Sequence, residues 1–242
     1  MRTPWLVIAA TELRLILRNK LVAAIALLVP LAFGAVFAFG GSDGDMPPPV
    51  RAMVQIATLL AFTVYCTATT TLTARRQGLY LKRLRTSSAS TMSIVTGLAA
   101  PLFVVVIVQA GLLTGVSGVY RGQWPERPWT LVLALVIGSV TCAAVAFLTA
   151  AFTSSPEMAQ VTTVPFMLSL IGSTIWVIDR PSDQVDWIGL AIPGGALAHL
   201  TRAAWGESHL VAEVLPAAAV ALVTAAVSIG LAVRLFRWEP RA

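Results

Sequence analysis

Six long apolar runs dominate this sequence, and each is long enough to cross a membrane as an α-helix. A span needs about 20 mostly apolar residues. The runs cover residues 21–39, 52–74, 94–116, 130–152, 159–178 and 211–236. Only 12% of the residues are charged, whereas an ordinary soluble domain has about 25%. The sequence therefore predicts an all-α polytopic membrane protein with one transmembrane domain, residues 1–242, in which residues 21–178 hold the first five spans.

Residues 1–20 are predicted to form an amphipathic helix that lies in the membrane interface. At about 100° per residue, apolar and polar side chains fall on opposite sides. The apolar side holds Trp5, Leu6, Ala9, Leu13, Ile16 and Leu17, and the polar side holds Thr11, Arg14 and Arg18. Such a helix is too short and too interrupted to span, but it suits the membrane surface. In the first span that follows, Pro30 predicts a kink.

Residues 179–210 form a second segment that is not expected to cross the membrane. Its apolar run, from Trp187 to Ala198, is too short to span. Backbone in lipid must satisfy its own hydrogen bonds, so we expect short re-entrant or interfacial helices packed on the spans, capping the outer face. Arg202 is expected to be an interfacial anchor, with a substrate contact as the alternative.

The basic residues predict the orientation of the chain. With both termini in the cytoplasm, twelve of the 17 basic residues face inward and five face outward, as the positive-inside rule requires. The inner set is Arg2, Arg14, Arg18, Lys20, Arg75, Arg76, Lys82, Arg83, Arg85, Arg234, Arg237 and Arg241. The outer set is Arg51, Arg121, Arg127, Arg180 and Arg202. Because these cations are split among loops that flank the membrane, the net charge of +6 does not indicate nucleic-acid binding.

Several kinds of chemistry are missing from the sequence. A P-loop needs a lysine followed by serine or threonine, but Lys20 precedes Leu21 and Lys82 precedes Arg83. We therefore expect no bound ATP. The two histidines, His199 and His209, lie in the outer segment without the spacing of a metal site. Cys66 and Cys142 fall within apolar runs and imply no disulfide framework. We expect no catalytic residue and no metal.

Two local patterns allow alternative interpretations. Gly115-Val116-Ser117-Gly118 matches the motif of rhomboid-type intramembrane proteases, but that chemistry needs a histidine base at membrane depth, and no predicted span has one. A turn at the end of the third span explains its glycines more simply. Residues 35–38 loosely resemble a signal-peptide cleavage site. The run there is long and follows a separate helix, so we expect the first span to be retained.

The spans contain few charges that could couple transport to an ion. Glu213 and Arg234 lie near span ends, where we expect them to reach the interface. The threonines of the second span are expected to serve helix packing, with contact to a substrate as the alternative. A proton- or sodium-coupled carrier is therefore disfavoured, although a neutral site at broken helices remains an alternative.

The loop after the second span is the strongest candidate for a partner contact. Residues 73–87 contain five basic residues and no acid, and Leu81 and Leu84 are three residues apart on one helical face. One interpretation is a topology signal combined with an interfacial helix. The other is a docking helix that offers an apolar ridge flanked by cations to a cytosolic protein.

This loop resembles a segment of bacterial type-2 ABC exporter permeases, and Arg76, Gly78, Leu81, Arg83 and Leu84 fill the pattern. Two further stretches agree in order: residues 153–159 resemble the cytoplasmic connection between the family's fourth and fifth spans, and residues 193–206 resemble its outer segment. The chain departs from the pattern at Ala74-Arg75, where an acid is common, and at Ser88, near a frequent proline.

The resemblance implies a permease subunit of the bacterial plasma membrane. It would pair with a second permease copy or a related permease, contact membrane lipid and bind cytosolic P-loop ATPase subunits that carry ATP and Mg²⁺. It would export drugs, lipids or glycan-like molecules between the two copies. Residues that would couple to the ATPase are Arg14, Arg76, Gly78, Leu81, Lys82, Arg83, Leu84, Arg85 and Glu157. Residues that would line the path, on the second and fifth spans, are Thr63, Thr67, Thr70, Thr163, Phe166 and Ser169.

Overall fold

The computed structural model describes residues 4–40, 46–86, 90–180, 184–206 and 210–236, and every regular element within them is helical. The first half of the chain forms α1 (Pro4–Arg18), α2 (Lys20–Ala23), η1 (Ala24–Leu28), α3 (Val29–Phe39), α4 (Pro48–Leu59), η2 (Leu60–Cys66), α5 (Thr67–Gln77), α6 (Tyr80–Arg85) and α7 (Thr91–Arg121). The second half forms α8 (Pro128–Phe152), α9 (Pro156–Thr162), α10 (Val164–Ile178), α11 (Trp187–Ala191), α12 (Gly195–Arg202), η3 (Ala203–Trp205), η4 (Leu210–Val214) and α13 (Leu215–Leu235).

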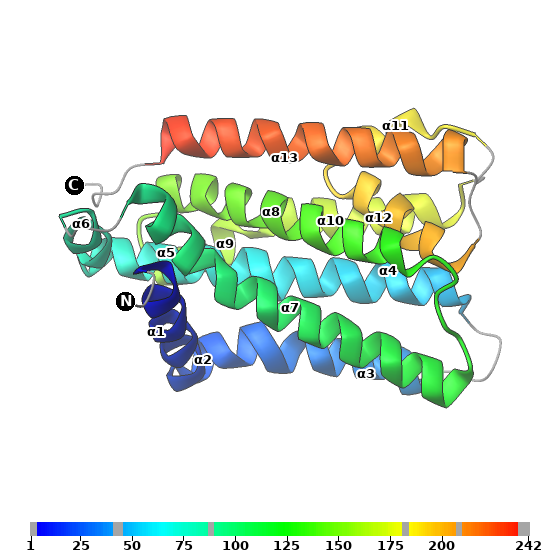
Figure 1. Cartoon of the computed structure of the whole chain (residues 1–242), viewed down its shortest axis with the longest axis horizontal. Helices are drawn as coiled ribbons and strands as arrows, with labels where there is room; N and C mark the ends of the chain where they lie inside the picture. The colour runs from blue at the N-terminus through cyan, green and yellow to red at the C-terminus, as the bar shows by residue number, and fades with distance from the viewer. Residues whose placement is uncertain (1–3, 41–45, 87–89, 181–183, 207–209, 237–242) are drawn as a thin grey trace.

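Six helical runs among these residues are long and apolar enough to cross a membrane, which confirms the predicted fold class. They are Lys20–Phe39, Pro48–Gln77, Thr91–Arg121, Pro128–Phe152, Pro156–Ile178 and Ala212–Leu235, here called spans 1 to 6. They run side by side along the long axis of the molecule, whereas α1 crosses one end (Figure 1). That end also holds α6 and the last residues of α5 and α13; we call it the basic end, and the opposite end the far end.

Span 2 lies at the centre of the bundle. It is almost wholly enclosed by the rest of the chain, whereas spans 1, 3, 5 and 6 expose most of their surface. Its mean hydropathy of 1.5 is the lowest of the six, against 2.6 for span 1. A helix that faces protein rather than lipid can carry polar side chains, because neighbouring helices supply hydrogen-bond partners. The threonine-rich sequence of span 2 fits this central position.

Span 1 contains a π-helical turn, η1, just before Pro30. Proline lacks a backbone N–H, so Pro30 provides no helical donor for the carbonyl of Ala26, four residues earlier. Two buried side chains from other spans meet that oxygen: Gln109 Nε2 donates at 3.1 Å, and Thr63 Oγ1 lies 2.9 Å away. The hydroxyl of Thr63 also lies 2.7 Å from Gln109 Oε1. The hydrogen bonds at this carbonyl thus link spans 1, 2 and 3 next to Pro30, where the sequence predicts a kink.

The two ends of the bundle carry different surface residues. Large exposed aromatic side chains gather at the far end: Tyr120, Trp124, Trp129 and Trp187. Exposed cations gather at the basic end: Arg14, Arg18, Lys20 and Arg234. Aromatic belts and flanking cations are typical of membrane–water interfaces. α1 is held against span 3 where Gly97 leaves room for Ile8, since a Cβ on that glycine would stand 2.7 Å from the Ile8 side chain.

The predicted turn at Gly115–Gly118 is wrong, because span 3 continues as a helix to Arg121 and ends at Gly122, which has a left-handed φ of +68°. Gly118 is instead a contact point, where an added Cβ would stand 2.5 Å from the ring of Trp124. Ser117 is buried beside a small cavity. The residues that share this cavity are Pro48, Arg51, Ala52, Gln55, Thr114, Gln123 and Trp205. No described histidine lines it, so the described residues supply no base for a serine protease there.

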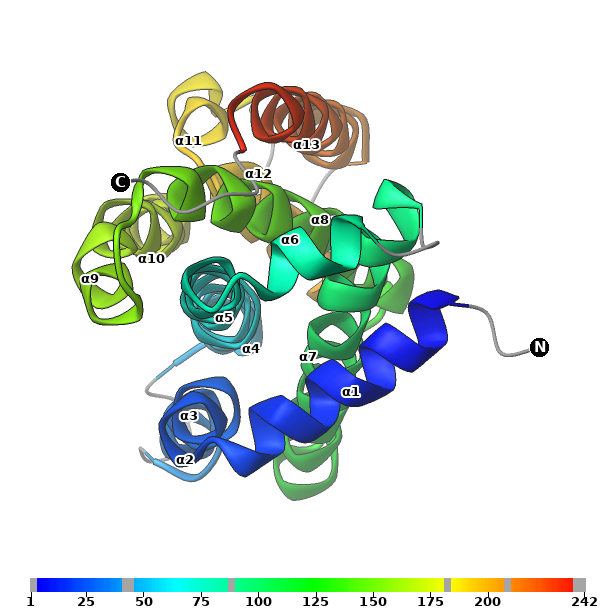
Figure 2. The same cartoon turned by 90° about the vertical axis from the view of Figure 1, so that its left-hand side faces the viewer.

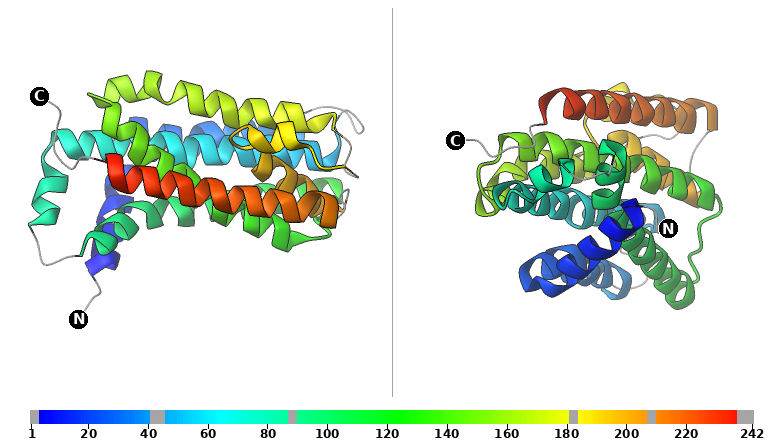
Figure 3. Two further views of the ribbon diagram at one scale, coloured as in Figure 1. Left: turned by 90° about the horizontal axis from the view of Figure 1, so that it is seen from above. Right: turned by 60° about the vertical axis from the view of Figure 1, so that its left-hand side comes forward.

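The outer segment, residues 184–206, folds as the short helices α11 and α12, as expected. Both lie at the far end (Figure 3), where α11 packs against α10 and α12, and α12 packs against α10 and span 6. The turn between them is tight: Gly194 has a φ of +104°, and a Cβ on Gly195 would stand 1.8 Å from the carbonyl oxygen of Gly189. Ser169 on α10 donates to the carbonyl of Pro193 at 2.8 Å.

Arg202 and Glu213 do not occupy the interfacial positions expected from the sequence. Both are buried, at 5% and 3% exposure, and Arg202 Nε donates to Glu213 Oε1 at 2.8 Å. Arg202 also donates to the carbonyls of Val177 and Arg180, at 2.9 and 2.7 Å. The expectation failed because the two charges, eleven residues apart, neutralise each other inside the fold instead of reaching water.

Candidate functional site

A large cavity that is open to the surface lies at the basic end, where α1 bends into span 1. Asn19 makes this bend: its backbone is extended, and its side-chain oxygen accepts from the amides of Leu21 and Val22, at 3.1 and 3.2 Å. An asparagine in this position satisfies N–H groups that the first turn of a helix leaves free. The bend therefore has a defined geometry, and it forms one wall of the cavity.

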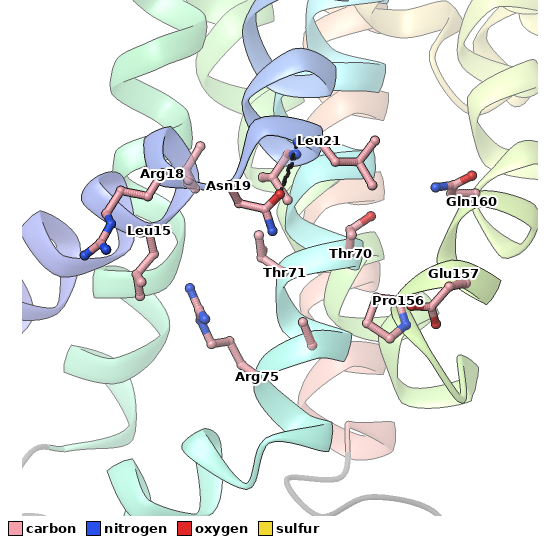
Figure 4. A pocket seen from close by; sticks show the side chains of 13 residues that line it. Leu15, Arg18, Asn19, Leu21, Thr70, Thr71, Arg75, Pro156, Glu157 and Gln160 are labelled. Atoms are coloured by element: carbon pink, nitrogen blue, oxygen red, sulfur yellow. Dashed lines mark hydrogen bonds between the residues drawn. The ribbon is translucent and has the colours of Figure 1, made fainter.

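The cavity has a volume of about 720 Å³ and three walls (Figure 4). The first wall comes from α1 and span 1, the second from α5 at the end of span 2, and the third from α9 at the start of span 5. Its lining residues are Leu15, Ile16, Arg18, Asn19, Leu21, Val22, Thr70, Thr71, Ala74, Arg75, Pro156, Glu157 and Gln160. Apolar side chains, hydroxyls, amides and charges of both signs thus meet in one space, a chemistry that suits an amphipathic molecule.

An ion pair between Glu12 and Arg75 fastens α1 to the end of span 2. Arg75 Nη2 lies 3.1 Å from Glu12 Oε2, and Arg75 Nε donates to the same carboxylate at 3.2 Å. The carboxylate is buried, whereas the guanidinium is partly exposed beside the cavity. Arg75 also lies 5.5 Å over the ring of Tyr80, and burial, reinforced by Glu12, raises the pKa of that phenol. Charge on this wall is therefore largely neutralised within the chain.

This pair is not predicted from the sequence, although α1 carries a signal for it. Glu12 lies four residues from both Ile8 and Ile16, so the three share one face of α1, and that face is buried. A lone acid on an apolar face of an interfacial helix needs a cation. The partner lies 63 positions away, and periodicity along one helix cannot identify it.

The end of span 2 is also tied to the connection between spans 4 and 5. Arg76 is buried and donates through Nη2 to the carbonyl of Thr153. Gln77 Nε2 donates to the carbonyl of Ser154 at 2.9 Å. Ser155 then caps α9 by accepting from the amide of Met158 at 3.3 Å. Two stretches that the sequence analysis treated separately, residues 73–87 and 153–159, are thus parts of one structure.

A comparison with known protein families identifies the chain. The model of the ABC-2 family transporter proteins matches residues 50–234, which is well over half of the 242 residues. The chain belongs to the ABC-2 transporter family. It is therefore a multi-pass membrane subunit of a transport system, of a kind that associates with an ATP-binding cassette ATPase. No curated protein matches the sequence.

The match begins inside α4 and ends near the end of α13, so it includes the turn after span 2, the connection before α9 and the outer segment. α1 and span 1 lie outside it. The ion pair between Glu12 and Arg75 therefore joins the part of this ABC-2 protein that lies outside the match to the part that lies within it.

The expected ridge of Leu81 and Leu84 is not exposed, which corrects the prediction. α6 folds back on the bundle, and Leu81 is fully buried in a cluster that includes Ile8, Ile94 and Phe147. Leu84 is partly buried against the same cluster. An apolar side chain gains more by packing on these spans than by facing water. The side chains of Lys82, Arg83 and Arg85 lie outside the described part of the structure.

Leu79 is the exposed apolar residue of this loop, and the sequence analysis did not select it. It follows Gly78 at the end of α5, has a φ of +56° and is 43% exposed. A left-handed backbone is costly for leucine. The side chain thus stands out from the basic end on a strained turn. Of the other expected coupling residues, Arg14 and Glu157 are also exposed at this end, whereas Arg76 is buried.

The residues expected to line a path separate into two groups. Thr70 lines the cavity, and Phe166 and Ser169 are partly exposed on α10; the ring of Phe166 packs edge-on against Tyr65 at 4.8 Å. The other three, Thr63, Thr67 and Thr163, are buried. Thr67 and Thr163 donate to carbonyls of their own helices, each at 2.8 Å, and Thr63 meets Ala26 and Gln109. In this conformation these three hydroxyls stabilise helices and contacts between spans.

Proposed function

We propose that this chain is the permease subunit of an ATP-binding cassette exporter, which moves a hydrophobic or amphipathic molecule outward across a bacterial plasma membrane. A separate cytosolic P-loop ATPase would bind ATP and Mg²⁺ and hydrolyse the ATP. The substrate would be a drug, a lipid or a glycan-like molecule. The basic end, with both termini, would face the cytoplasm, in accord with the positive-inside rule.

One observation carries this proposal: the cavity at the basic end is built from the same segments that would contact the ATPase. Its second wall, α5, continues into the Gly78–Leu79 turn, and its third wall, α9, is connected to α5 through Arg76 and Thr153. Its first wall is connected to α5 through Glu12 and Arg75. A force applied to the exposed turn would therefore reach all three walls through hydrogen bonds and an ion pair.

The open side of the cavity supports a path between two permease copies. Seen from the basic end, α2 and α3 lie on one side of α4 and α5, and α9 and α10 lie on the other (Figure 2). A second copy, of this chain or of a related permease, would close the space between them. Spans 2 and 5 would then line the path, with Thr70 at its cytoplasmic entrance and Phe166 further in.

Coupling to ATP follows from differential binding. ATP brings two ATPase subunits together, and this movement drives transport only if it stabilises one permease conformation over another. Shifting a two-state equilibrium from 1:99 to 99:1 needs about 5.5 kcal/mol. Contacts at Leu79 and at the α6 cations would supply part of that difference, and the connections around Arg76 would transmit it to the cavity.

The test is whether Leu79 binds an ATPase without supporting the fold. Leu79→Gly removes an exposed side chain and suits the left-handed backbone, so the chain should remain at least as stable. We expect wild-type protein from its native membrane to co-purify with a P-loop ATPase and to lack ATPase activity once stripped of it. The Leu79→Gly variant should lose most of the bound ATPase.

Leu81→Ala is the matched comparison, because it also removes a leucine from this loop but opens a cavity in the core. It should lower thermal stability, by about 2–5 kcal/mol. ATP turnover by the stripped chain, or full retention of the ATPase by a well-folded Leu79→Gly variant, would contradict the proposal.

A further inference from the structure

Four charged or titratable side chains form a buried cluster at the far end, which we call the His199 cluster: Asp186, His199, Arg202 and Glu213. The side chains of His199 and Glu213 are each 2% exposed, and that of Asp186 is 11% exposed. His199 Nδ1 lies 2.6 Å from Glu213 Oε1, and Arg202 Nη2 donates to the same oxygen. On the other side of the ring, His199 Nε2 lies 3.5 Å from Asp186 Oδ2.

The members of the cluster come from three parts of the outer end. Asp186 caps α11, where its Oδ1 accepts from the amide of Gly189 at 2.9 Å. His199 and Arg202 lie on α12, and Glu213 lies on η4 at the start of span 6. Through Arg202 the cluster also reaches the end of α10. The only contact in the cluster that joins α11 to α12 is the one between Asp186 and His199.

That contact lacks a proton when the imidazole is neutral. The carboxylate of Glu213 can only accept, and it lies closer to Nδ1 of His199 (2.6 Å) than the donor Arg202 Nη2 does (3.2 Å), so we assign the hydrogen of the neutral ring to Nδ1. A neutral ring then presents a bare Nε2 to Asp186 Oδ2, which places two acceptors face to face. Neither atom has a hydrogen-bond partner among the described residues. A proton on His199 Nε2 would make that nitrogen a hydrogen-bond donor to Asp186 Oδ2.

The charge balance of the cluster favours the same state. Two carboxylates face one guanidinium, so with neutral His199 the buried cluster carries one uncompensated negative charge. Buried charge without a partner is costly. Protonated His199 makes the cluster neutral, with two groups of each sign.

The other elements packed against α12 also carry charged groups. The helices and turns packed against α12 carry Arg51 on α4, Arg127 at the start of α8, Asp179 and Arg180 at the end of α10, and Arg234 on α13. Arg51 donates to Gln123 and to the carbonyl of Met46, and Arg180 lies 4.1 Å over the ring of Trp176. Among the described residues, contacts to the ring nitrogens of His199 come from Asp186, Arg202 and Glu213.

We propose that His199 is a proton-binding site that fastens α11 to α12, and that the proton arrives from the far end past the partly exposed carboxylate of Asp186. Histidine changes its charge between about pH 5 and pH 8. Acidification on the far side thus closes the outer segment more firmly over the ends of spans 5 and 6.

The test measures the thermal unfolding midpoint of the full chain in lipid nanodiscs, from about pH 8 to about pH 5.5. A native state that binds a proton more tightly than the unfolded chain does gains stability as the pH falls. We expect the wild-type midpoint to rise on acidification by about 2–4 °C more than that of Asp186→Asn. The asparagine keeps the oxygen that caps α11 and replaces the charged oxygen that faces His199 with a neutral NH2 group. The two proteins are identical at every other position, so the difference isolates this site.

His199→Gln gives an independent comparison, since a glutamine can still donate to Glu213 but takes up no proton. It should show the same reduced acid shift as Asp186→Asn. An acid shift of equal size in wild type and in either folded variant would overturn the proposal, as would a wild-type midpoint that falls relative to the variants.

A transport assay, which rests on the proposed export function, extends the test. In vesicles, acid on the far side should slow export severalfold in wild type and leave Asp186→Asn unaffected. A stability shift without any export would count against the proposed function while supporting the proton site. Export with no difference in acid stability between wild type and Asp186→Asn would count against the proton site alone.

Discussion

At the scale of single residues, the polar side chains of this membrane protein act mainly on one another. Thr63 and Gln109 meet a carbonyl that Pro30 leaves without its helical donor, and Arg76 reaches the carbonyl of Thr153. In lipid no water can replace such partners, so a polar group on a span must find one in the protein. The residues that appear most functional from sequence are therefore often structural.

The ion pair between Glu12 and Arg75 makes this argument testable. Arg75→Ala leaves a buried carboxylate without its cation, so we expect a loss of stability of about 3–5 kcal/mol. Arg14→Ala, an exposed cation on α1, should change stability by less than about 0.5 kcal/mol. Denaturation of the two variants in the same lipid provides the comparison. Equal stability would mean that the pair does not hold α1.

At the scale of elements, the sequence predicted the spans better than their ends and contacts. Apolar composition suffices to locate six helices, because each must match the thickness of the membrane. It does not place the end of span 3, where Gly115 and Gly118 favour a turn in the sequence but the helix continues to Arg121. Gly118 is needed for the packing of Trp124, a contact that no local pattern contains.

The candidate site was predicted only in part, for a related reason. Basic residues and family-like motifs located the loop after span 2 and the connection before α9. Whether a side chain such as Leu81 faces a partner or its own core depends on how α6 folds back on distant helices. The charges of the outer segment were likewise assigned to the interface because their partners lie in other elements.

The link between span 2 and the α9 connection predicts a local effect of mutation. Arg76→Ala removes the donor to the carbonyl of Thr153, so the amides of residues 153–155 and 157–159 should exchange hydrogen faster while the rest of the spans remains protected. The lost hydrogen bond from a charged group corresponds to about 1.5–3 kcal/mol. Gln77→Ala, an exposed neighbour that bonds the next carbonyl, should have a smaller effect. The same exchange rate in both variants would show that Arg76 has no special role in this connection.

At the scale of the whole molecule, the unequal ends of the bundle predict its orientation in the membrane. Arg14, Arg18, Lys20 and Arg234 are exposed at the basic end, and Trp124, Trp129 and Trp187 are exposed at the far end. Because the positive-inside rule places short basic loops in the cytoplasm, we expect the basic end there. The native cysteines do not interfere with a labelling test, since Cys66 and Cys142 are 8% and 0% exposed within the bundle.

Single cysteines at exposed positions test this orientation in intact cells. Glu126→Cys and Asp179→Cys, at the far end, should react with an impermeant thiol reagent added outside. Arg14→Cys and Gln77→Cys, at the basic end, should react only after the membrane is opened. All four sites are exposed in the structure, so a difference between the pairs reports the side of the membrane and not burial. Labelling of Arg14→Cys and Gln77→Cys from outside would show that the orientation is the reverse of the one expected. The cavity and the Leu79 turn would then lie where no cytosolic ATPase could reach them.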